Sequence, residues 1–187
     1  MYFFCGLTSA TFVGVGYLLY FSALWLPVPQ WMHGLTEALV PLVGSLRSAA
    51  RVANEAGANP FPAQLMITYG VIGCLLLPFA FCWHVHLSPQ RRTRWLDDMA
   101  ANNATNRRLS RVRLFLHGAG LTLASPLYVA FWFADTTAKS IGWRAHLLYS
   151  DTFWGVTFFQ LLFPALFGML VLLSTLMLAM SFRRQSN

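Results

Sequence analysis

The chain has 187 residues, of which 57 % are hydrophobic and only 10 % are charged, and its formal net charge is +7. A soluble domain carries about 25 % charged residues, so this composition excludes an ordinary soluble globular domain. The length allows one domain, and the sequence predicts an all-α integral membrane protein.

Four apolar segments without Asp, Glu, Lys or Arg predict four transmembrane helices. A run of about 18 or more uncharged, apolar residues is long enough to cross the hydrocarbon of a bilayer. The predicted spans cover residues 2–26, 63–87, 114–134 and 153–182. The first is interpreted as a retained span, because no basic residue precedes it and it is too long for the core of a signal peptide.

Between the first two spans, the stretch LTEALVPLVGSLRSAARVANEA predicts one amphipathic helix outside the bilayer, over residues 35–56. Its apolar face is formed by Leu35, Leu39, Leu42, Leu46, Ala49 and Ala53. Arg47, Arg51 and Glu55 lie on another face. A helix of this kind lies on a membrane surface or docks on a partner, and the sequence leaves both possibilities open.

The second span leads into FAFCWHVHLSPQRRTRWLDD, where the chain leaves the membrane. Ser88 followed by Pro89 predicts a new helix, since Ser is a preferred N-cap and Pro a preferred first helical residue. Trp95, Leu96 and Met99 are expected to touch the membrane from that helix.

The basic residues are distributed unequally between the two predicted sides of the membrane. Nine of the thirteen lie in the loop between the second and third spans or in the C-terminal tail. These nine are Arg91, Arg92, Arg94, Arg107, Arg108, Arg111, Arg113, Arg183 and Arg184. Because cytoplasmic segments carry the excess of Lys and Arg, both termini and this loop are predicted to be cytoplasmic, in a bacterial-type inner membrane.

These arginines lie close to the span ends, which favours a role in topology over the binding of nucleic acid. They are also expected to attract anionic lipid headgroups. The predicted partners are therefore the lipid bilayer and other membrane protein subunits, with no nucleic acid.

Histidines near the cytoplasmic ends of two spans allow a haem hypothesis. His84 and His117 lie close to the ends of the second and third spans, which are antiparallel. If those spans face one another, the two rings reach the same depth and provide the two axial ligands of a b-type haem, with Gly118 and Gly120 leaving room for it. No metal site is predicted, since Cys82 and His86 share a face but supply only two of the four ligands of a structural zinc site.

Small residues at four-residue spacing predict close contact between helices. Gly6, Ala10 and Gly14 follow one face of the first span, and Gly70 lies in the second. Gln160 is expected to make an interhelical hydrogen bond, because a buried amide is costly in lipid. The spacing predicts contact with another helix, either within the chain or in another subunit.

The sequence predicts a non-enzymatic accessory subunit of a membrane assembly. No catalytic arrangement is visible, and no charged residue lies in mid-span. Two other functions stay open. The chain is similar in size, span number and orientation to four-helix immunity proteins that protect bacteria from pore-forming toxins, although no motif carries that similarity. The second open function is that of a membrane anchor of a redox complex that binds haem b. Apart from this haem, no cofactor is expected.

Overall fold

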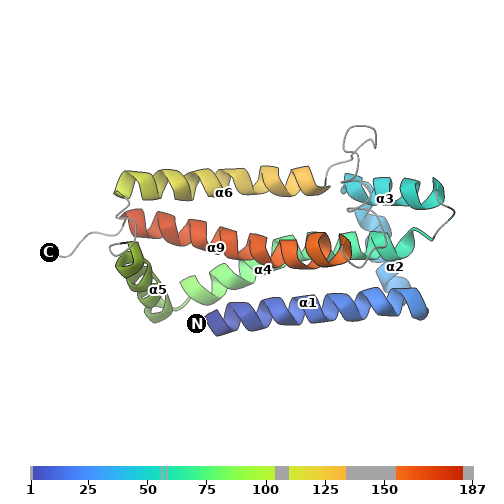
Figure 1. Cartoon of the computed structure of the whole chain (residues 1–187), viewed down its shortest axis with the longest axis horizontal. Coiled ribbons are helices and arrows are strands. Elements are labelled where there is room, and N and C mark those ends of the chain that lie inside the picture. The colour runs from blue at the N-terminus through green and yellow to red at the C-terminus, as the bar shows by residue number, and fades with distance from the viewer. Residues whose placement is uncertain (1, 56, 58, 104–109, 134–154, 183–187) are drawn as a thin grey trace.

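The structure is a computed structural model, and it describes residues 2–55, 57, 59–103, 110–133 and 155–182. Every regular element in these ranges is a helix. The predicted loop over 135–152 and the first residues of the fourth span lie outside the described residues. So do four of the nine arginines used to predict the orientation: Arg107, Arg108, Arg183 and Arg184. Four long helical segments of the described residues pack along one another, and shorter helices lie at both ends (Figure 1).

The first long helix, α1 (Tyr2–Trp25), ends two residues before Pro27 and is followed by two short helices, α2 (Gln30–Leu39) and α3 (Gly44–Glu55). The prediction of one helix over 35–56 is therefore wrong. Pro41 has no N–H to donate and clashes with the preceding turn, which ends the first of the two helices. Leu46 and Ala49 of α3 are fully buried, whereas Leu42 in the break is 78 % exposed.

The second long helix, α4 (Phe61–His86), contains Pro78, and α5 (Pro89–Asn102) begins after a short turn. Ser88 is the N-cap residue of α5 and Pro89 follows it, as the sequence predicts. The expectation that Trp95 and Leu96 touch the membrane is wrong, because both are 7 % exposed and pack in the core with α4 and α9.

The third long helix, α6 (Arg111–Phe133), begins three residues before the predicted span. The last segment starts as a π-helix, η2 (Val156–Leu162), and continues as α9 (Phe163–Phe182). Pro164 has no N–H, so the carbonyl of Gln160 loses its α-helical donor, and the turn before the proline is wound more widely.

The long helices form an open row in the order α1, α4, α9, α6. In this row α4 packs along α1 and α9, and α6 packs along α9. The sequence-based expectation that the second and third spans face one another is wrong, because α9 lies between α4 and α6. Shape complementarity between helices decides this order, and the apolar composition of the spans does not encode it.

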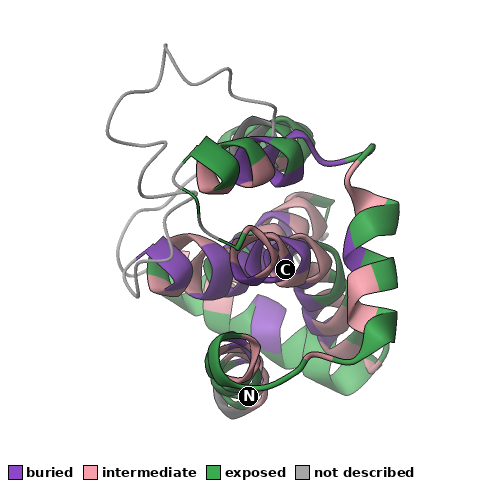
Figure 2. Cartoon of the chain, turned by 90° about the vertical axis from the view of Figure 1, so that its right-hand side faces the viewer, coloured by how far each residue is buried: buried purple, intermediate pink, exposed green. Residues whose placement is uncertain are grey.

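The core lies mainly between α4 and α9. Leu77, Phe81 and Val85 recur every four residues on α4 and are buried against Leu172 and Leu176 of α9. Buried side chains gather where helices face one another, and outward faces are exposed (Figure 2). The exposed faces are themselves apolar, with Leu18, Leu75, Leu123 and Leu166 each more than 65 % exposed. An apolar exterior of this extent fits lipid rather than water.

Three helices of the described part are long and apolar enough to cross a membrane: Phe4–Trp25, Phe61–His86 and Val156–Phe182. They support an integral membrane protein. The predicted span over 114–134 is helical up to Phe133 but is not among these three, so a fourth span remains a prediction.

The two ends of the row differ in charge. The start of α1, the end of α4, α5, the start of α6 and the end of α9 lie toward one end, and α2 and α3 lie toward the other (Figure 1). The described arginines divide accordingly: Arg91, Arg92, Arg94, Arg111 and Arg113 are at the first end, and Arg47 and Arg51 at the second.

Candidate functional site

The small-residue face of α1, formed by Gly6, Ala10 and Gly14, contacts no other helix of the described chain. All three residues are exposed, and a Cβ added at either glycine meets nothing within 4 Å. Of the three helices that are long and apolar enough to cross a membrane, α1 is also the least buried. Inside the structure, 17 % of the residues in its apolar stretch are buried, against 50 % for Phe61–His86 and 44 % for Val156–Phe182. The predicted small-residue face therefore points away from the chain's own helices.

The chain's own contact with α1 uses different residues. Gly16 is buried, and a Cβ there would collide with Leu161 and lie 2.9 Å from the ring of Tyr69. The Tyr69 hydroxyl donates a hydrogen bond to the Phe12 carbonyl at 2.7 Å. Gly16 falls outside the four-residue spacing of Gly6, Ala10 and Gly14, so the sequence pattern does not predict this contact.

Gly70 and Gln160 meet at the contact between α4 and η2. A Cβ on Gly70 would lie 2.7 Å from Gln160 Oε1 and 3.3 Å from the Gln160 carbonyl oxygen. Gln160 is 4 % exposed, and its Oε1 has no hydrogen-bond partner among the described residues. The structure thus brings together two residues that the sequence assigned separately to helix packing, without the expected hydrogen bond to Oε1.

His84 and Arg91 form a contact that joins α4 to α5. The Arg91 guanidinium donates to the His84 carbonyl at 3.0 Å and lies 2.8 Å from His84 Nδ1. Because an arginine only donates, this ring nitrogen accepts. The His84 ring also stacks on Phe4 of α1, with ring centroids 3.6 Å apart.

His117 lies on the other side of α9, on the first turns of α6. Its Nδ1 is 2.6 Å from the Arg113 carbonyl oxygen, so that nitrogen carries the hydrogen and donates. Gly118, expected to leave room for a haem ring, instead packs on α9. Haem ligation by His84 and His117 remains a prediction. It assumed that the two helices carrying these histidines face one another, and α9 lies between them. No group of three or more metal-binding side chains occurs in the described part.

We expect the purified full chain to show no Soret band in its visible absorption spectrum, and His117→Ala to leave that spectrum unchanged. The reason is that α9 separates the helices that carry the two histidines. A stoichiometric Soret band that disappears in His117→Ala would contradict this expectation and restore the haem-anchor function.

The contact between α6 and α9 contains a seam of small and polar residues that sequence analysis did not identify as a unit. A Cβ on Gly118 would lie 3.0 Å from both the Leu178 nitrogen and the Ser174 carbonyl oxygen. One turn further on, Thr122 Oγ1 donates to Ser174 Oγ at 3.2 Å. The signal was present in the spacing of Gly118 and Thr122, four residues apart on one face.

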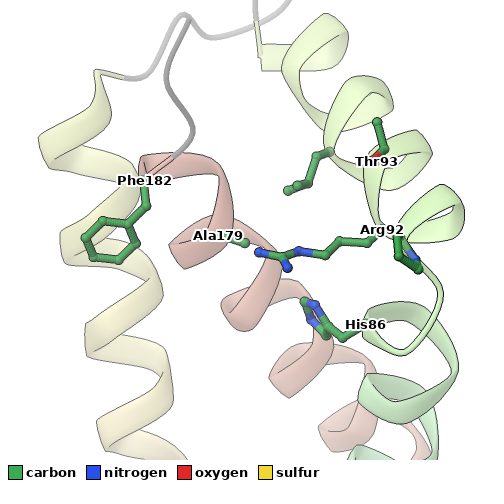
Figure 3. Close-up of a pocket in the computed structure, with 7 residues that line it drawn as sticks. His86, Arg92, Thr93, Ala179 and Phe182 are labelled. Carbon is green, nitrogen blue, oxygen red and sulfur yellow. The ribbon is translucent and has the colours of Figure 1, made fainter.

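A pocket of about 330 Å³ lies where α4 ends, α5 begins and α9 ends. Its lining residues are His86, Pro89, Arg92, Thr93, Leu96, Ala179 and Phe182. Figure 3 shows the Arg92 side chain extending from α5 toward Ala179 on α9, with the His86 ring beside it. His86 Nε2 is 3.1 Å from the hydroxyl of Thr175, which also lies 3.8 Å from Cys82 Sγ. Cys82 and His86 therefore share a face, as predicted, and that face packs on α9.

Comparison of the chain with protein-family models, curated proteins and solved structures finds no match.

Proposed function

We propose that this chain is a non-enzymatic accessory subunit of a multiprotein assembly in a bacterial-type inner membrane. It crosses the membrane four times, with both termini and α5 on the cytoplasmic side. A helix of a partner subunit packs on the small-residue face of α1. The observation that carries the proposal is the open space at Gly6 and Gly14, on the least buried of the three helices that are long and apolar enough to cross a membrane.

Helix contact in lipid depends on close van der Waals packing, because lipid tails are as apolar as the helices themselves. A face of small residues allows two backbones to approach closely. The other glycines of the long helices that have neighbours, such as Gly70, Gly73 and Gly168, already face another helix of the chain. The small-residue face has the same chemistry without an internal partner, which supports a contact with another subunit.

The open row supports the same function. In a row, an outermost helix has one side without a long neighbour, and α1 is an outermost helix that packs mainly on α4, with smaller contacts to η2 and α9. The orientation is supported by the arginines of α5 and α6, which lie at the end where α1 starts and α9 ends.

A photoreactive group at position 10 is expected to crosslink the chain to its partner subunit. We expect Gly14→Leu to remove this crosslink without changing the stability of the isolated chain. A leucine at Gly14 meets no atom of this chain within 4 Å at its Cβ, but it prevents close approach of a partner backbone. Overpacking costs about 1–3 kcal/mol, which lowers the association constant of the contact by about 5- to 150-fold. The measurement is photo-crosslinking from position 10 in the native membrane, together with the melting temperature of the purified chain.

Two substitutions control this experiment. Val15→Leu adds bulk at an exposed position on a different face and should leave the crosslink intact. Gly16→Leu should lower recovery of the chain itself, because Leu161 and Tyr69 occupy the space. A protein crosslink that survives Gly14→Leu, or only lipid adducts from position 10, would contradict the proposed function.

A further inference from the structure

The pocket between α4, α5 and α9 lies at the level where two membrane-spanning segments end. His86 is the last residue of α4 and Phe182 the last of α9, and both line the pocket. This places it at the boundary between hydrocarbon and headgroups. Helix α5 covers it from the side, held there by Trp95 and Leu96, which are buried against α4 and α9.

The pocket contains a positive charge that no lining residue neutralises. Arg92 provides the guanidinium, and no carboxylate is among the lining residues. Within the described part of the chain, that guanidinium donates no hydrogen bond; Arg91 next to it, by contrast, is engaged by His84. The acidic residues of α5, Asp97 and Asp98, lie five and six positions beyond Arg92 and therefore on other faces of the helix.

The remaining lining residues divide into two kinds. His86 and the hydroxyl of Thr93 add polar groups next to the guanidinium, whereas Leu96, Ala179 and Phe182 are apolar. Figure 3 shows the Arg92 guanidinium next to Ala179, with the His86 ring close to it. A ligand that fits carries an anionic head with hydrogen-bond acceptors and an apolar portion directly attached to it.

We propose that this pocket binds a phosphate group, with Arg92 as its charged ligand and Thr93 and His86 beside it. A guanidinium binds phosphate through two parallel hydrogen bonds. This contact therefore depends on the geometry of the guanidinium, whereas a general attraction between opposite charges does not. The phosphate is that of an anionic phospholipid headgroup or of a free phosphate anion. The site is independent of the accessory function proposed above, because it lies on α5 and not on α1.

The test compares lipid retention by the full chain and three variants. Each protein is reconstituted in vesicles of phosphatidylcholine containing phosphatidylglycerol, re-extracted in mild detergent and analysed by native mass spectrometry. We expect the unmodified chain to retain phosphatidylglycerol in preference to phosphatidylcholine. Arg92→Gln should lower that retention about tenfold, as expected for losing a hydrogen bond between charged groups. Arg92→Lys keeps the charge but not the paired geometry and should retain an intermediate amount.

Arg94→Gln is the matched control, since Arg94 is exposed on the same helix and does not line the pocket. It should retain phosphatidylglycerol like the unmodified chain. In a second arm, inorganic phosphate is added to lipid-free protein in detergent. If phosphate raises the melting temperature of the unmodified chain but not of Arg92→Gln, and no lipid is retained, the pocket takes a free anion. Equal retention in Arg92→Gln and Arg94→Gln, with no phosphate effect, overturns the proposal. The helical circular dichroism of each variant verifies that it is folded.

Discussion

Gly118→Leu is expected to destabilise the chain strongly, whereas Gly120→Leu, two residues further along the same helix, is tolerated. A Cβ at Gly118 lies 2.8 Å from Leu178 Cγ and 3.0 Å from two backbone atoms of α9. Backbone atoms cannot rotate away, so α6 must move off α9. At Gly120 an added Cβ meets nothing within 4 Å.

The expected cost of Gly118→Leu lies at or above the upper end of about 1–3 kcal/mol for overpacking, since the obstruction is backbone. Separation of the helices also weakens the hydrogen bond from Thr122 to Ser174. Gly120→Leu should stay within about 0.5 kcal/mol of the unmodified chain. The measurement is the melting temperature and the recovery of monodisperse protein. Similar losses for both variants, or for neither, would show that α6 does not pack on α9 as described.

A cysteine at position 54 should react with a membrane-impermeant thiol reagent in intact cells, whereas one at position 100 should react only after permeabilisation. Asn54→Cys lies on α3 and Ala100→Cys on α5, and both positions are exposed. Neither substitution changes the net charge, so the distribution of basic residues that sets the orientation is preserved. The effect expected is all-or-none, because one membrane span, α4, separates the two positions.

The parent chain is the control for this labelling, since Cys5 and Cys74 are buried and Cys82 is half-buried. A reporter fused after Asn187 extends the test to the fourth span. With four spans the C-terminus returns to the side of the N-terminus, and with three it lies on the opposite side. Labelling of both cysteines from outside, or a C-terminus outside the cell, would contradict the four-span orientation.

Antiparallel packing of α6 along α9 supports the proposed four crossings, although α6 is not one of the three helices that are long and apolar enough to cross a membrane (Figure 1). Its first residues include Arg111 and Arg113, placed at the proposed cytoplasmic end. Positive residues at the end of a span can extend to the headgroup level without a large cost. In the proposed four-span orientation, the boundary of this helix with water is set by its arginines, and not by the first apolar residue.

The residues of the proposed phosphate site are brought together by tertiary contacts. The sequence places Arg92 and Thr93 shortly after the Ser-Pro start of a helix. There, the orientation of the chain in the membrane is enough to explain the arginine. Only the packing of Trp95 and Leu96 onto α4 and α9 turns α5 back against the span ends and brings Arg92 over His86. Without these long-range contacts, Arg92 resembles any arginine that flanks a membrane span.

The sequence by itself determined the long helices, their approximate ends and the division of charge between the two ends of the molecule. These features depend on local physics: uncharged apolar runs long enough for the bilayer, prolines at helix boundaries, and arginines near span ends. The start of α5 at Ser88 and Pro89 was predicted for the same reason. Pro41 also indicates a helix break, but the apolar periodicity continues on both sides of it and led to the prediction of a single helix.

Only the tertiary structure decided which helices are neighbours. A helix that is apolar on every side has no face that hydrophobicity selects, since any side can meet lipid. The order α1, α4, α9, α6 depends on the fit of particular surfaces. It separates His84 from His117, fills the space beside Gly118 with α9, and leaves Gly6 and Gly14 open. Glycines that look equivalent in the sequence therefore differ in their surroundings: some are packed against another helix, and others are open.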